Sequence, residues 1–200
     1  MKLIVFILLL VLTFYNLHSK GIRYEVPCSA LVLVTAIDKA ESQKGLVEKT
    51  GNNDGSHIEN YLKSVGLNPK GHYPYCASGL YWSFSEAVKE LNLSTDNIPV
   101  YRTGSANKMY DEARKKGRQS IYLPHSGDLL VWRLVTSYNG HIEMIIKKTG
   151  NGIYKTFGFN TSSGIKGSQS NGGGNYYRYR SIFDAIGRLQ VRGIIGFTLS

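Results

Sequence analysis

The chain has 200 residues, of which 42% are hydrophobic and 12% aromatic, and its formal charge at pH 7 is +10. This length and composition fit one globular domain and exclude a disordered or fibrous chain. The positive charge favours polyanions as partners, but no nucleic-acid-binding motif accompanies it, so we expect no nucleic acid. Lysines that are merely solvated are the alternative.

The first residues predict a secretory signal peptide. Lys2 is followed by an unbroken apolar run over 3–14 and a polar stretch that ends at Ser19. A basic tip, a short apolar segment and a small residue are typical of such a signal, and the run is shorter than the roughly 20 residues that cross a bilayer. We therefore expect a signal over 1–19, one domain over 20–200 and an exported protein without a transmembrane span. An uncleaved membrane tether is the alternative.

The first half of the domain shows helical patterns, and the third of them is the most regular. Apolar residues follow Cys76 at spacings of three, four and seven or eight, so this cysteine begins the buried face of an amphipathic helix. A polar loop over 48–55 separates the first two helices. The expected helices cover 29–44, 56–65, 76–91 and 105–117.

The second half changes to strand patterns with turns between them. A Gly/Ser-rich loop covers 162–175. Helices first and a meandering sheet second predict an α+β domain in which N-terminal helices pack on a C-terminal antiparallel β-sheet. The expected strands cover 128–133, 141–147, 153–160, 176–180 and 191–199.

Two cysteines, Cys28 and Cys76, allow either a disulfide or free thiols. Export permits the disulfide, but a domain of this size does not need one, and the position of Cys76 favours a free thiol. The unpaired N–H groups and the dipole at a helix N-terminus favour a thiolate, which is the nucleophilic form of cysteine. Neither a CxxC motif nor a zinc-type spacing of cysteine and histidine occurs, so we expect no metal and no cofactor.

A cysteine nucleophile also needs a base, and His141 is the best candidate among the five histidines. It follows Gly140 and begins an apolar strand, which would hold the imidazole rigidly and leave one face free. The remaining histidines lie in the signal, at a helix start or in loops.

Four motifs resemble the CHAP family, the cysteine, histidine-dependent amidohydrolases and peptidases of bacteria and phages. They are PYCA at 74–77, GDLLVW at 127–132, GHIEMI at 140–145 and GFNTS at 158–162. The loop over 48–55 and the helix after it look like the lead-in of phage and prophage members. The resemblance covers residues 29–162, and it departs from the pattern at Tyr75 and Phe159, which alter the groove wall.

The resemblance implies a papain-like fold and a Cys-His-Asn triad in which Cys76 is the nucleophile, His141 the base and Asn160 the residue that orients the imidazole. Glu143 is the alternative for the third role, because it shares a strand face with His141. Asp128 is expected to fix a turn, Trp132 to lie in the core, and Asn53 and Asp54 to be weak candidates for contact with the groove.

The implied substrate is peptidoglycan, cut at the muramoyl–alanine amide or within the stem or cross-bridge peptide. The basic surface would attract anionic cell-wall polymers, and the domain is expected to be a monomer. A wall-binding or assembly protein that keeps the fold without catalysis is the alternative from another class. A secreted antibacterial effector would share the chemistry.

Overall fold

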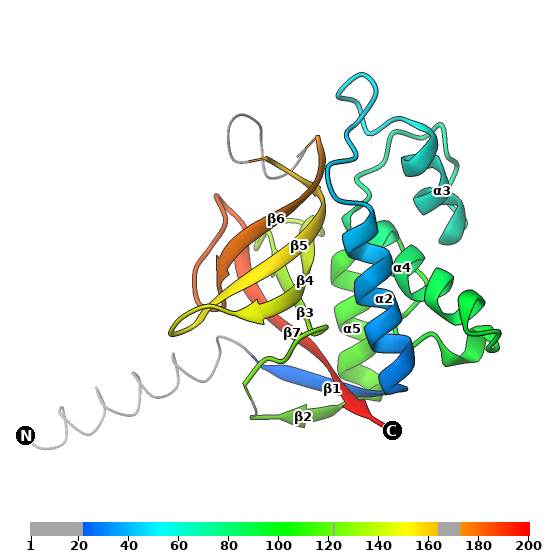
Figure 1. Cartoon of the computed structure of the whole chain (residues 1–200). Coiled ribbons are helices and arrows are strands. Elements are labelled where there is room, and N and C mark those ends of the chain that lie inside the picture. The colour runs from blue at the N-terminus through cyan, green and yellow to red at the C-terminus, as the bar shows by residue number, and fades with distance from the viewer. Residues whose placement is uncertain (1–21, 122, 164–172) are drawn as a thin grey trace, which may run out of the picture.

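The computed structural model describes residues 22–121, 123–163 and 173–200 (Figure 1). The predicted signal over 1–19 and part of the Gly/Ser-rich loop lie outside the described residues. The elements in chain order are β1 (Arg23–Cys28), α2 (Ala30–Ser42), α3 (Ser56–Ser64), α4 (Cys76–Glu90), the 3-10 helix η1 (Thr95–Asn97), α5 (Ala106–Lys116), β2 (Arg118–Ser120), β3 (Leu129–Arg133), β4 (Gly140–Lys148), β5 (Ile153–Thr161), β6 (Gly174–Ser181) and β7 (Gln190–Leu199).

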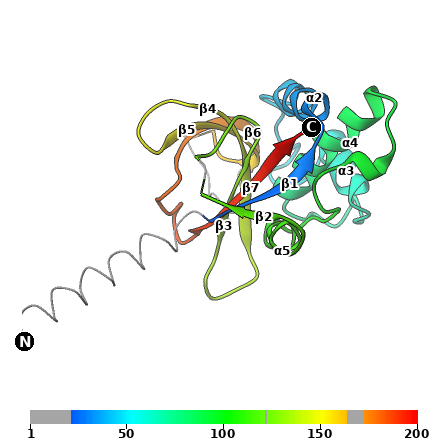
Figure 2. The same ribbon diagram turned by 90° about the horizontal axis from the view of Figure 1, so that it is seen from below.

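The strands of the described chain form one seven-stranded sheet in the order β2-β1-β7-β3-β4-β5-β6. β1 and β7 pair in parallel, whereas every other pair of neighbours is antiparallel. Figure 2 shows these two strands side by side although they come from opposite ends of the domain. The predicted α+β class is therefore confirmed, but the sheet is mixed rather than purely antiparallel.

The predicted helices and strands coincide with α2 to α5 and β3 to β7 to within two residues at most ends. Sequence reasoning missed β1, because it begins with charged residues that read as solvent-exposed. Arg23 and Glu25 are in fact only 3% and 8% exposed. Arg23 donates to both carboxylate oxygens of Asp128, at 2.8 and 3.1 Å, and forms an ion pair with Glu25. Asp128 also accepts from the backbone N–H of His125 at 2.9 Å, so its predicted structural role in the turn is confirmed.

The main core contains buried residues of the helices and of one face of the sheet. α2 lies on α4, α4 contacts β4 and β5, and α5 contacts β3 and β7. The opposite side chains of the strands build a second, smaller cluster, because successive residues of a strand point to opposite faces. Its buried members are Leu130, Trp132, Ile145, Tyr154, Ile182 and Ile194. Trp132 is fully buried there, as predicted. In the part of the chain described, no helix has the length and hydropathy to cross a membrane.

Candidate active site

Cys76 is the first residue of α4, which confirms the predicted position of the cysteine at a helix start. Its thiol is free, as is that of Cys28, so the two cysteines form no disulfide. Tyr75 precedes it as the N-cap residue, and the first N–H groups of a helix have no partner within the helix. The helix also approaches β5 closely, since a Cβ at Gly79 would lie 2.3 Å from the ring of Phe159. The first turns of α4 therefore lie close against β5.

His141 is the second residue of β4 and is 3% exposed. It lines a pocket of about 340 Å³ together with Cys76 and Asn160. The ring of Trp132, on the neighbouring strand, lies 6.0 Å from the imidazole, centroid to centroid. The two residues that sequence reasoning chose as nucleophile and base therefore meet in one pocket.

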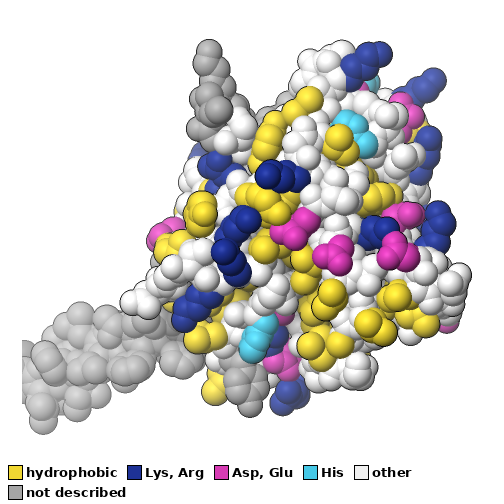
Figure 3. All heavy atoms as spheres, viewed as in Figure 1, with side chains coloured by type: hydrophobic (Ala, Val, Ile, Leu, Met, Phe, Trp, Pro, Cys, Tyr) yellow, Lys and Arg dark blue, Asp and Glu magenta, His cyan; other side chains and the backbone are white. Residues whose placement is uncertain are grey.

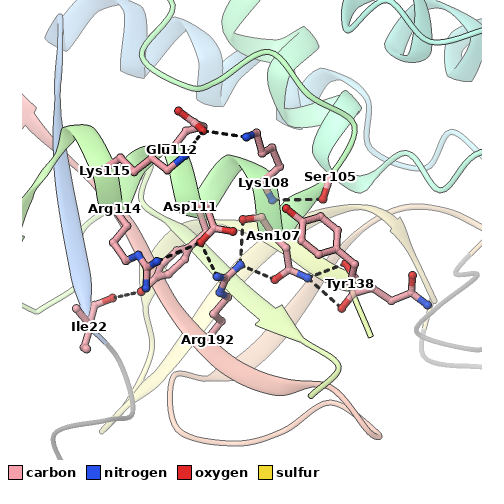
Figure 4. Close-up of polar contacts among 12 residues, drawn as sticks. Ile22, Ser105, Asn107, Lys108, Asp111, Glu112, Arg114, Lys115, Tyr138 and Arg192 are labelled. Carbon is pink, nitrogen blue, oxygen red and sulfur yellow. Dashed lines mark hydrogen bonds and ion pairs between the residues drawn. The ribbon is translucent and has the colours of Figure 1, made fainter. Parts of the chain in front are cut away.

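The loop that leads into β4 is fixed by Asn107 of α5, which is 3% exposed (Figure 4). The side-chain NH₂ of Asn107 donates to the carbonyl oxygens of Tyr138 and Asn139, at 2.8 and 3.2 Å. Its Oδ1 accepts from Arg192 at 2.8 Å. A Cβ at Gly140 would lie 2.7 Å from the Trp132 carbonyl and 3.0 Å from Asn107 Nδ2. The residue before His141 therefore has to be glycine for the strand to begin in this place.

Glu143, two residues further along β4, is the group that contacts the imidazole. Its Oε1 lies 3.0 Å from His141 Nε2, and the carboxyl group is completely buried. Thr156 donates to Oε2 at 2.6 Å, and Arg180 donates to Oε2 from Nε at 2.9 Å and to Oε1 from Nη2 at 2.6 Å. This contact engages Nε2 and leaves Nδ1 as the second ring nitrogen, and Cys76 lines the same pocket as the imidazole.

These contacts shift the pKa values of both groups. Burial by itself would lower the pKa of His141, but hydrogen bonding and charge interactions with Cys76 and Glu143 outweigh it and raise the pKa to about 9. Burial by itself would raise the pKa of Glu143, yet hydrogen bonds and charge interactions with His141 and Arg180 hold it well below its ordinary value. At neutral pH the site therefore favours an ionised carboxylate beside a protonated imidazole.

Asn160, which sequence reasoning preferred for the orienting role, lies in the same pocket but has a different contact. Its Nδ2 donates to Oδ1 of Asn53 at 3.0 Å. The pairing of β5 with β6 is irregular between Gly158 and Thr161, so strand alternation does not give the direction of this side chain. The hydrogen bond to the His141 ring comes from Glu143, the alternative candidate.

Asn53 brings the loop over 48–55 to the pocket. Besides accepting from Asn160, it donates from Nδ2 to the carbonyl of His72 at 3.1 Å. Asn53, His72 and Asn160 all have left-handed backbones, with φ of 51°, 52° and 50°. Such conformations cost free energy and cluster at functional sites. The chain of contacts ties the loop, the segment before Cys76 and the end of β5 together. Asp54, the other weak candidate, instead accepts from Thr50 within its own loop.

Arg180, Asn107 and Thr156 are site residues that sequence reasoning missed. Arg180 and Thr156 lie on strands that were predicted, but nothing in the local pattern indicates that they face Glu143. No protein-family model, curated protein or solved structure matches the chain. The function therefore has to be inferred from the geometry of this pocket.

Proposed function

We propose that the chain is a papain-like cysteine amidohydrolase similar to the CHAP family, and that it cuts amide bonds of peptidoglycan. One observation carries the proposal: a free thiol at the first residue of a helix lines the same pocket as an imidazole whose Nε2 contacts a buried carboxylate. We assign the nucleophile to Cys76, the base to His141 and the orienting group to Glu143. Asn160, first expected in that last role, is assigned to the wall of the pocket.

In the first step the Cys76 sulfur, as thiolate, attacks the carbonyl carbon of the amide, and the C=O electron pair moves to oxygen. The unpaired N–H groups at the start of α4 are suited to stabilise that oxyanion. His141 then gives its proton to the nitrogen of the leaving amine as the C–N bond breaks. The products of this step are an acyl-enzyme thioester and the free amine.

In the second step water attacks the thioester, and the neutral imidazole of His141 takes the proton from the water. The sulfur leaves as thiolate, the carboxylic acid product departs, and the imidazole is again protonated. Glu143 keeps one ring nitrogen engaged through both steps, so the ring presents the same nitrogen to the sulfur and to the substrate.

The substrate proposal combines the motif resemblance with the expected export. We propose the muramoyl–alanine amide or a bond in the stem or cross-bridge peptide as the target, and a monomer as the active form. Lys and Arg side chains are spread over the face drawn in Figure 3, interrupted by acidic ones. Such a surface would attract anionic wall polymers diffusely rather than through one patch.

Digestion of purified cell walls tests the proposal. The wild-type chain is expected to release new amino groups, whereas Cys76→Ala and His141→Ala should release none above background. Cys28→Ala is the matched control, because Cys28 is a second buried free thiol that does not line the pocket. It should digest walls at the wild-type rate. Equal release by the wild type and both site variants would reject the proposal.

Alkylation by iodoacetamide separates catalysis from wall binding alone. A thiolate reacts quickly near neutral pH, whereas a buried neutral thiol does not. We expect Cys76 to be labelled much faster than Cys28. Binding of walls by the wild type without release of amino groups, and with an unreactive Cys76, would indicate a non-catalytic wall-binding protein.

A further inference from the structure

A buried arginine stands behind the site on the far side of Glu143. Arg180 belongs to β6, near its end, and is 6% exposed. It grips the carboxylate of Glu143 with two nitrogens, at 2.6 and 2.9 Å, and its Nη2 also donates to Thr161 Oγ1 at 3.3 Å. Its guanidinium lies 5.8 Å from the centre of the Trp132 ring, which itself neighbours His141. Arg180 thus reaches the site through Glu143, which contacts His141, rather than by lining the pocket itself.

The surroundings are shaped around this ion pair. A Cβ at Gly158 on β5 would lie 2.9 Å from Glu143 Cγ and 3.1 Å from its Cδ and Oε1. Hydroxyl groups of Thr156 and Thr161, also on β5, donate to the carboxylate at 2.6 and 3.3 Å. A buried ion pair contributes to stability only when its geometry is good and its remaining hydrogen bonds are made. Here the carboxylate has a full set of donors in a close-fitting space.

We propose that Arg180 is a positioning residue, which holds Glu143 ionised and aimed at His141 so that the Cys76 sulfur and the imidazole can share their proton as an ion pair. The inference rests on the proposed thiol chemistry of the site, but not on which bond is cut. From Cys76 through His141 and Glu143 to Arg180, the groups would carry alternating charges that sum to zero.

The reason lies in the cost of a buried carboxylate. A completely buried carboxyl group takes up a proton unless cations and hydrogen bonds favour its ionised form. Among the described residues, the charged groups that act most strongly on Glu143 are His141 of its own strand and Arg180 of β6, and β5 supplies neutral hydroxyls. Cys76, from α4, acts on it through the imidazole. Without Arg180, Glu143 would be protonated at a higher pH and would no longer favour the imidazolium.

The test follows the rate of Cys76 alkylation by iodoacetamide from pH 4 to 9 in the full chain. Arg180→Met keeps most of the side-chain volume and removes the charge. We expect the acid limb of the profile to move to higher pH by about one unit, which is about a tenfold lower rate at the foot of the limb. Arg180→Lys, which restores a cation without the two-pronged grip, should recover part of the shift.

Arg23→Met is the matched control. Arg23 is also buried, at 3% exposure, and also binds a buried carboxylate with two nitrogens, that of Asp128. Its other side-chain partners are Glu25 and Ser120 rather than a residue that contacts His141. We expect this variant to lose thermal stability as Arg180→Met does and to keep the wild-type pH profile. A profile of Arg180→Met that coincides with those of the wild type and of Arg23→Met would overturn the inference.

Arg180→Met could fail to fold, so a second comparison uses Glu143→Gln as the background. The double variant removes the whole buried ion pair, which is less disruptive than breaking it. If Arg180 acts through Glu143, the double variant Glu143→Gln, Arg180→Met should have the same alkylation profile as the single variant Glu143→Gln. A further shift of the acid limb would mean that Arg180 acts by another route. A wild-type chain whose Cys76 is no more reactive than Cys28 would instead reject the proposed function itself.

Discussion

Replacement of Gly158 by alanine tests the close fit around Glu143 with a single methyl group. The new Cβ would lie 2.9 Å from Glu143 Cγ, well inside van der Waals contact. Glu143 cannot yield freely, because Arg180 holds both its oxygens and Thr156 holds one of them. We therefore expect either the carboxylate or strand β5 to shift, and either movement lengthens the hydrogen bond to His141.

The size of the effect follows from two opposing terms. Overpacking of a filled interior costs about 1–3 kcal/mol, whereas alanine in place of glycine restricts the unfolded chain and stabilises by about 0.4–1 kcal/mol. The net loss should be about 1–2 kcal/mol, which for a domain of this length lowers the melting temperature by roughly 2–8 °C. Displacement of the carboxylate by a few tenths of an ångström should also slow Cys76 alkylation at pH 6 severalfold to about tenfold.

Thermal melting followed by circular dichroism and the alkylation rate measure the two effects on the same samples. Gly150→Ala is the control on the same hairpin, since its Cβ would meet only Ile153 Cβ, at an ordinary 3.9 Å. It should melt at or slightly above the wild-type temperature and react at the wild-type rate. A Gly158→Ala variant that matched Gly150→Ala in both measurements would refute the reasoning, because Glu143 would then have room to move.

The remaining predictions concern the third residue, the loop before β4 and the second cysteine. Glu143→Gln is expected to slow wall digestion roughly 100-fold or more, because the amide keeps the shape but removes the charge beside the imidazole. Asn160→Ala should lower the rate of digestion less than about tenfold. If kcat/KM fell more in Asn160→Ala than in Glu143→Gln, the orienting role would belong to Asn160. Asn107→Ala, which frees the loop leading to His141, should lower kcat/KM roughly tenfold, and an unchanged value would show that the loop holds itself. Burial raises the pKa of the Cys28 thiol to about 11, so Cys28 should be alkylated only at strongly alkaline pH or after unfolding. Labelling of Cys28 in the folded chain at pH 7, detected by mass spectrometry, would contradict this expectation.

Much of the fold could be predicted because its helices and strands have clear local patterns. The apolar spacing after Cys76 fits only a helix with one buried face, and α4 begins at that residue. The apolar run after Gly140 fits a buried strand, and β4 contains this run. The two catalytic candidates were therefore found from local context, and the family resemblance added a reason to pair them.

The sequence alone thus determined where the helices and the later strands lie, that Cys76 starts a helix and that His141 starts a strand. Tertiary structure decided which of the two candidate side chains contacts the imidazole. Alternation along β4 put Glu143 on the same face as His141. A carboxylate can be buried and ionised there only because Arg180, 37 residues further on, donates hydrogen bonds to it, and this is why we prefer Glu143 to Asn160. The burial of strand β1 also depends on a distant residue, because Arg23 is buried beside Asp128, which is 105 residues away in the sequence. The physical reason is that the ionisation of a buried group depends on charges brought close by folding, which a local pattern does not contain.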